Sequence, residues 1–232
     1  MTSAILLLGA FFFLFLMSVV FHELGHAVAA LWCGDTTARD LGRITLNPLD
    51  HLDPIWSVLL PIATTFLIGL PFGGAKPVPV NPLNFRNPRR DDLIVTLAGP
   101  AANVVQAVIY AVLYHLIFGD AGRQEVVNNG LGVVLVAMVF VNILLTIFNL
   151  MPVPPLDGSH VLAALLPAAA ADAYRRVGFF GILIVLMLLS MTNLGYYLQL
   201  GTFLAMDALG LSREISVPAM QEIFNLTSRI GL

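Results

Sequence analysis

Charged residues are scarce in this chain of 232 residues. Asp, Glu, Lys and Arg together make up 11%, where a soluble domain carries about 25%. Hydrophobic residues make up 58%. A soluble fold of this length could not bury so much apolar surface, so lipid must be the solvent for much of the chain. The composition excludes an ordinary soluble enzyme and predicts an integral membrane protein in a lipid bilayer.

Basic tracts and paired cysteines are lacking as well. The chain has 11 Lys and Arg against 14 Asp and Glu, a formal net charge of −3, and no run of basic residues. Nucleic acid is therefore not expected as a partner. The single cysteine, Cys33, cannot form a disulfide within the chain. Its place at the end of an apolar run favours a packed thiol.

The first apolar run has no Lys or Arg before it, so the positively charged start of a signal peptide is missing. The run extends from Ala4 to Cys33 and is broken mainly by the polar residues between His22 and His26. At about 1.5 Å per residue it is longer than a bilayer core of about 30 Å. We expect a retained transmembrane helix.

Further apolar stretches predict an all-α polytopic membrane protein with about five transmembrane helices. Residues 93–118 and 130–151 are each long enough to span. Residues 177–206 are too long for one span and contain a plausible turn, so we interpret them as two short spans. Charged residues return after Met206, and the tail 207–232 is expected to be cytoplasmic or interfacial.

Residues 54–71 are also apolar and long enough to span, but we expect them to re-enter the membrane and return. With that topology, ten of the 11 basic residues lie on the cytoplasmic side, as the positive-inside rule favours. Counting 54–71 as a full span would move four of them, from Lys76 to Arg90, to the outer face. The charge distribution therefore favours a re-entrant segment.

The regions flanking this segment are rich in Pro, Gly, Asn and charge. Residues 42–46 predict a short strand, and 76–80 an extended stretch whose prolines prevent continuous pairing. Together they predict a small membrane-associated β element. Such an element could offer an edge to an unwound substrate.

The strongest chemical signal is the segment HELGH at 22–26. Residues four apart share one helix face, so His22 and His26 can offer imidazole nitrogens to one zinc ion. Glu23 is then suited to take a proton from water beside the ion. The alternatives are a chance match or helix-packing hydrogen bonds. Three clustered ionisable residues are costly within lipid, and this cost favours a functional site.

A catalytic metal site needs a third protein ligand, and Asp157 is the best candidate. It follows a proline-rich bend that starts at Met151, and Gly158 after it permits a tight turn. Asp157 also precedes an apolar run, where an Asp can cap a helix. The local sequence leaves both interpretations open.

These motifs in combination resemble the site-2 protease family of intramembrane zinc metalloproteases. The resemblance rests on HELGH at 22–26 with Asn149, Pro152 and Asp157-Gly158, and on LAGPAAN at 97–103 and GGAKPVP at 73–79. It covers roughly residues 17–160 and looks like the compact form of the family, without PDZ or CBS domains.

The resemblance implies one catalytic zinc ion held by His22, His26 and Asp157, with Glu23 as the catalytic acid and base. It suggests that Asn149 steadies the substrate or the oxyanion, and that Asn103 has a weaker supporting role. The implied substrates are membrane-spanning proteins, cleaved by regulated intramembrane proteolysis. A separate regulatory membrane protein is expected, because no regulatory domain is recognised.

The implied organisation is a single transmembrane protease domain over residues 1–206, with its core at 3–160, followed by the tail. The implied location is the plasma membrane of a prokaryote, with the active site toward the cytoplasm. If Asp157 shares a metal with the histidines, the 4–33 and 130–151 spans must run in the same direction. An odd number of crossings must then lie between them. Residues 93–118 supply one crossing and 54–71 would make two, so 54–71 is again expected to be re-entrant.

Two other functions use the same buried polar residues: a transporter or metal permease, and a catalytically silent scaffold. The complete set of two histidines, a glutamate and an aspartate argues against a scaffold. Of the remaining histidines, His51 is expected in an exposed loop, with a second metal site as the alternative. His160 could orient Asp157.

Overall fold

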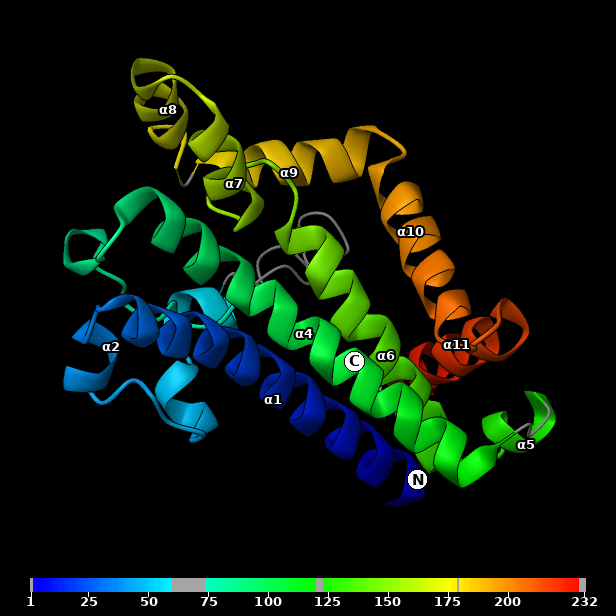
Figure 1. Cartoon of the computed structure of the whole chain (residues 1–232). Coiled ribbons are helices and arrows are strands. Elements are labelled where there is room, and N and C mark those ends of the chain that lie inside the picture. Colours follow the sequence, from blue (N-terminus) through cyan, green and yellow to red (C-terminus); the bar gives the residue numbers. More distant parts are fainter. Residues whose placement is uncertain (1, 60–73, 120–122, 179, 230–232) are drawn as a thin grey trace. The chain divides into compact units, whose positions relative to one another are not determined.

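A computed structural model of the chain describes residues 2–59, 74–119, 123–178 and 180–229 (Figure 1). These residues form helices and connecting loops, and no strand occurs among them. The elements in chain order are α1 (Thr2–Cys33), α2 (Thr37–Asp40), η1 (Pro48–His51), η2 (Pro54–Leu59), η3 (Pro82–Asn84), α4 (Pro88–Phe118), α5 (Arg123–Val127), α6 (Gly130–Asn149), α7 (Gly158–Leu165), α8 (Ala168–Arg175), α9 (Phe180–Met191), α10 (Leu194–Ala208) and α11 (Arg213–Arg229).

Among the described residues, three helices are long and apolar enough to cross a membrane. They are α1 over Ile5–Cys33, α4 and α6, and the sharply bent pair of α8 and α9 is a fourth candidate. The spans predicted from the first apolar run, from 93–118 and from 130–151 are confirmed as helices of sufficient length. The described part of the chain is thus all-helical, with apolar helices typical of an integral membrane protein, while the predicted count of about five spans is not confirmed.

The exposed surfaces of α1 and α4 are apolar, as expected for helices that face lipid. Phe13 is 58% exposed and Leu116 is 76% exposed. By contrast, α6 buries every residue from Gly132 to Phe140. A helix that is apolar on all sides is stable when other helices surround it. The helix α6 is therefore the central helix of the core to which it belongs.

The chain forms two compact units, and α1, α4 and α6 contribute to both. The first unit contains Met1–Ser18, Asn103–Ile147 and Gly195–Leu232. Its apolar core joins residues of α4, α5, α6, α10 and α11, including Tyr114, Val136 and Met206. The second unit contains Val19–Ala102 and Phe148–Leu194.

Three fully buried polar side chains connect α1, α4 and α6 within the first unit. Asn103 donates from Nδ2 to Oδ1 of Asn142 at 2.9 Å, and Asn142 donates from Nδ2 to Oγ of Ser18 at 3.0 Å. Polar groups in an apolar core are costly unless they are hydrogen-bonded. This network therefore fixes the register of the three helices.

The helix α10 runs antiparallel to α6 in the first unit (Figure 1). Its Phe203 ring lies 5.4 Å from the ring of Phe140, and Gly201 faces Ile147 further along α6. At the end of α10, the Leu209 carbonyl accepts a hydrogen bond from Nε2 of His115 at 2.8 Å. The end of α10 therefore lies beside the end of α4.

The C-terminal helix α11 packs against α5, which connects α4 to α6. The helix α11 therefore lies beside the connection between α4 and α6, and the cytoplasmic or interfacial position of 207–232 stays a prediction. Neither α9 nor α10 alone is long enough to be a candidate span, so the two spans predicted from 177–206 are not confirmed.

The predicted β element is not confirmed, since 43–47 and 74–81 have no regular secondary structure. The two stretches do meet, because the Arg43 guanidinium donates to the Lys76 carbonyl at 3.0 Å. Pro77 and Pro79 have no N–H to donate to a ladder. The Lys76 N–H is already bonded to the His51 carbonyl at 2.8 Å.

The predicted re-entrant segment, 54–71, is described only from Pro54 to Leu59, a π-helical turn, and 60–71 lie outside the described residues. Ser57 donates from Oγ to the Gly74 carbonyl at 2.7 Å. Residues 57 and 74 therefore lie in contact with each other. The re-entrant course of 54–71 stays a prediction.

Candidate metal centre

Two glycines let α4 approach the face of α1 that carries His22 and His26. A Cβ at Gly25 would lie 2.6 Å from the Ala98 carbonyl oxygen. A Cβ at Gly99 would overlap the His26 imidazole and lie 2.8 Å from Cε1 of His22. Only glycine fits such close approaches. Sequence reasoning missed this role, although Gly99 belongs to the LAGPAAN segment.

Asp157 is held by a tight bend after α6. A Cβ at Gly158 would overlap the Leu150 carbonyl and lie 2.6 Å from the Met151 carbonyl oxygen, so the predicted tight turn is present. Asp157 occupies the N-cap position of α7, but its carboxylate makes no capping hydrogen bond. The carboxylate instead points toward the histidines, which decides between the two interpretations that the sequence left open.

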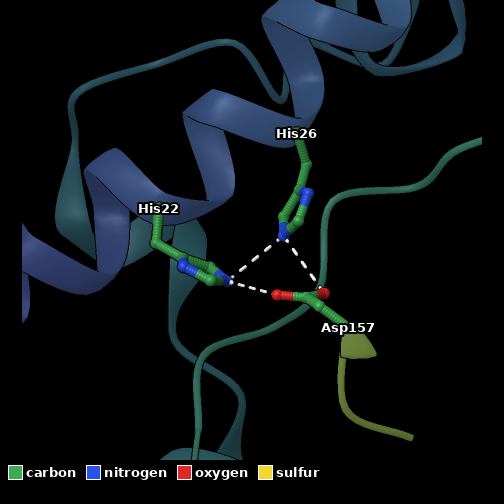
Figure 2. A group of neighbouring side chains, drawn as sticks. All are labelled: His22, His26 and Asp157. Carbon is green, nitrogen blue, oxygen red and sulfur yellow. Dashed lines mark hydrogen bonds and ion pairs between the residues drawn. The ribbon is translucent and has the colours of Figure 1, made fainter. Parts of the chain in front are cut away.

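The three side chains converge on one point, as Figure 2 shows. Nε2 of His22 lies 3.2 Å from Nε2 of His26. Oδ2 of Asp157 is 3.3 Å from Nε2 of His22, and Oδ1 is 3.4 Å from Nε2 of His26. His22 is buried, and the other two are half-buried. Among the described residues, they form the one group of three that could hold a metal ion.

The spacing of these atoms fits a zinc ion. Two ligands at about 2.0–2.1 Å from zinc, at a tetrahedral angle, lie about 3.3–3.4 Å apart. The Nδ1–H of His26 donates to the Val95 carbonyl at 2.7 Å, so Nε2 of the neutral ring presents a lone pair to the group. Oδ2 of Asp157 is buried and accepts no hydrogen bond from the described residues. Converging lone pairs repel one another unless a cation lies between them.

Electrostatics keep the third candidate ligand charged. Burial alone would raise the pKa of Asp157, but ion pairs with His22 and His26, when these are protonated in the absence of a metal ion, lower it to about 2. Asp157 is therefore a carboxylate at neutral pH, the form that binds a metal ion.

Glu23 lies beside this group on α1 and is half-buried. Its Oε2 accepts a hydrogen bond from the Val78 N–H at 2.8 Å. The carboxylate is thus oriented by a chain segment 55 residues away. No pattern in the sequence indicated this contact.

The two asparagines lie at well-defined places. Asn149 is the last residue of α6 and is half-buried, eight residues before Asp157. Asn103 is fully buried in the network with Ser18 and Asn142. The predicted roles of both asparagines in catalysis stay predictions.

The remaining predictions on single residues have mixed outcomes. His51 is fully buried and donates from Nε2 to the Thr45 carbonyl at 3.0 Å, so the expected exposed position is wrong. Its neighbours Asp50 and Asp53 suggested the alternative of a second metal site, but among the described residues His51 belongs to no group that could hold a metal ion. Nδ1 of His160 contacts the Asp92 carboxylate at 3.3 and 3.4 Å, so its side chain does not orient Asp157. Cys33 is buried and free, as predicted.

Two histidines on an apolar helix and an aspartate in the bend after α6, next to a glutamate in an HExxH segment, define the class of membrane metallopeptidases. The sequence profile of peptidase family M50 matches residues 10–126 and 115–191. The chain belongs to peptidase family M50, the site-2 protease family.

Curated relatives agree with this assignment. The chain is 36% identical over 185 residues to "Putative zinc metalloprotease YwhC" of Bacillus subtilis, which covers 78% of this chain and 80% of the relative. It is 35% identical over 175 residues to "Putative zinc metalloprotease Rip2" of Mycolicibacterium smegmatis, or 75% of this chain and 64% of the relative. The protein of the same name in Mycobacterium tuberculosis is 28% identical over 205 residues. No solved structure matches the chain.

Proposed function

We propose that this chain is a zinc metalloendopeptidase that hydrolyses peptide bonds within or next to the transmembrane segments of other proteins. The observation that carries the proposal is the convergence of His22, His26 and Asp157 within 3.2–3.4 Å of one another beside Glu23. The relatives named as zinc metalloproteases support zinc as the cofactor. The apolar helices that carry the site support substrates that lie in the membrane.

Each residue has a defined task in this proposal. His22, His26 and Asp157 would hold the zinc ion, and the Val95 carbonyl fixes the tautomer of His26 through Nδ1. Bound zinc supplies Lewis acidity, which acidifies water and polarises a carbonyl group. Glu23 accepts the proton of the attacking water and later delivers it to the nitrogen of the leaving amine.

The cellular setting follows the same proposal. Membrane-spanning protein substrates have to unwind locally, because a helical peptide bond is protected by its own hydrogen bonds. We place the chain in the plasma membrane of a prokaryote, with the site toward the cytoplasmic side and under the control of a separate membrane protein. Asn149 is the candidate for steadying the substrate, and Asn103 is a weaker one.

A transporter that uses the same polar residues is the competing function, and Glu23→Gln separates the two. Wild type and Glu23→Gln are co-expressed with a library of single-span proteins, and the fragments are compared by mass spectrometry. We expect fragments that disappear in Glu23→Gln while the purified variant retains zinc. If no fragment anywhere depends on Glu23, the protease proposal is wrong.

A further inference from the structure

The segment 74–81 presents a single backbone donor to Glu23. Within 77–79, the two prolines have no N–H, so Val78 is the residue that can donate. Its N–H lies 2.8 Å from Oε2 of Glu23. Among the described residues, this is the hydrogen bond that the Glu23 side chain makes.

The side chain of Val78 holds this donor in place on α1. Val78 is 8% exposed and packs in a cluster with Ala27 and Ala38. Ala27 follows Glu23 by four residues, so the two lie one turn apart on the same helix face. Val78 therefore contacts two adjacent turns of α1, one through its side chain and one through its N–H.

Both ends of the segment are attached independently of Glu23. At one end, the N–H of Lys76 donates to the His51 carbonyl at 2.8 Å. At the other end, the N–H of Asn81 donates to Oδ2 of Asp35 at 2.7 Å. Contacts other than the one with Glu23 therefore hold the Val78 N–H in its position.

A carboxylate on a flexible side chain needs such a support before it can transfer a proton in a defined direction. Proton transfer requires heavy atoms within hydrogen-bond reach, and a displacement of about 1 Å can cost about a hundredfold in rate. When a fixed donor holds one oxygen of a carboxylate, the other oxygen also has a defined position. Here Val78 would be the supporting residue and the Glu23 carboxylate the reacting group.

We propose that the backbone N–H of Val78 orients the Glu23 carboxylate for proton transfer, with Pro77 and Pro79 excluding competing donors on either side. The inference rests on the proposed function, because it takes Glu23 as the proton-transfer group. Val78 is a positioning residue that acts through Glu23. The KPVPV stretch at 76–80 contains no metal ligand, and its task would be to orient Glu23.

The test compares two substitutions at Val78 in the purified full-length chain, with a cleaved single-span protein as substrate. Val78→Pro removes the N–H, whereas Val78→Ala removes most of the side chain and keeps the N–H. We expect Val78→Pro to lower kcat by about tenfold or more, with KM within about twofold and zinc content as in wild type. We expect Val78→Ala to lower kcat by less than about threefold. Equal losses of kcat in the two variants would overturn the proposal.

The opposite outcome has a definite meaning as well. If the segment blocked Glu23 and had to leave before substrate bound, Val78→Pro would raise kcat or lower KM. Either result would overturn the positioning role.

A second measurement needs neither cleavage nor zinc, and it covers the case in which Val78→Pro does not fold. In the zinc-free protein, the hydrogen exchange of the Val78 amide is followed by NMR in wild type and in Glu23→Ala. We expect exchange at Val78 to accelerate by about tenfold or more when the acceptor is lost. The Lys76 amide, which is bonded to His51, serves as the control and should keep its rate. An unchanged rate at Val78 would overturn the inference.

The two measurements distinguish the inference from the proposed function. If no substrate is cleaved in a Glu23-dependent way but Val78 exchange depends on Glu23, the contact is real and the protease proposal is wrong. If cleavage depends on Glu23 and the two Val78 variants behave alike, the protease proposal stands and the positioning role is wrong.

Discussion

At the crossing of α1 and α4, Gly99 determines how closely the backbone approaches the histidines, because a Cβ at this position would overlap His26. A Cβ at Gly9 would meet nothing within 4 Å. Gly99 and Gly9 both lie on candidate membrane helices, so Gly9 is a matched control for Gly99. The metal site therefore depends on a residue that binds no metal.

Gly99→Ala should displace His26 and lower zinc affinity by about tenfold or more, since one methyl group would have to occupy the space of the imidazole. Competition with a zinc chelator on purified protein measures the affinity. Gly9→Ala is the control and should bind zinc as wild type does. Wild-type affinity in Gly99→Ala would show that the close approach is not present in the folded protein.

At the residue scale, the sequence predicted the histidine pair because its signal is local, whereas the role of Asp157 was left open locally and was implied by the family resemblance. His22 and His26 share a helix face by spacing alone, and ionisable residues in an apolar run are rarely there without a function. The Val78 donor and the Gly99 contact could not be predicted, because both depend on residues brought together across 55 or more positions. The burial of His51 could not be predicted either, because a loop sequence does not show how far the rest of the fold covers a side chain.

At the scale of elements, the loop after α1 is attached to the segment before α4 through Asp35. Its Oδ2 accepts from the Asn81 N–H at 2.7 Å, and its Oδ1 accepts from Nδ2 of Asn84 at 2.8 Å and from Thr37. Burial alone would raise the pKa of Asp35, but these hydrogen bonds hold it below its usual value. The same contacts fix one end of the segment that carries Val78.

Asp35→Asn should destabilise the protein by roughly 1.5–3 kcal/mol at neutral pH, the range for hydrogen bonds to a charged group. A lowered folded-state pKa means that the charge stabilises the fold above the unfolded pKa of about 3.9, and that this stability is lost as pH falls through the folded value. Thermal unfolding followed from pH 7 toward pH 3 measures the difference. The gap between wild type and variant should narrow on the acid side, and a constant gap would contradict the assignment.

The sequence predicted which long helices exist but not how the helices pack together. The length of an apolar run indicates whether a helix can cross, so α1, α4 and α6 were found. Run length does not indicate which helices pack together, and the return of α10 along α6 depends on contacts such as Phe203 with Phe140. The extended stretch at 76–80 was recognised from its prolines, but its hydrogen bonds go to separate partners and not to a strand.

At the scale of the whole molecule, the contact between α5 and α11 predicts which loops share a side of the membrane. The helix α4 separates Asn87 at one end from α5 at the other. The helix α11 packs on α5, so the chain after α10 must lie on the same side as the loop between α4 and α6. If α4 crosses the membrane as its length allows, we expect the C-terminal helix on the side opposite Asn87.

Single cysteines at exposed positions test this topology in a Cys33→Ala background. Asn128→Cys and Ser212→Cys should react with a membrane-impermeant thiol reagent from the same side, and Asn87→Cys from the opposite side. Labelling is compared in intact cells and in inverted vesicles. If Ser212→Cys and Asn87→Cys were labelled from the same side, this topology would be wrong and the two spans predicted from 177–206 would be supported.

The account as a whole depends on one metal ion being shared by α1 and the bend before α7. The most direct measurement is the zinc content of purified wild type, Glu23→Gln and Asp157→Ala after dialysis against a chelator. We predict one zinc ion per chain in wild type and in Glu23→Gln, and less than about a tenth of that in Asp157→Ala, because two imidazoles alone leave the site without its carboxylate. Full zinc occupancy in Asp157→Ala, or none in wild type, would contradict the account.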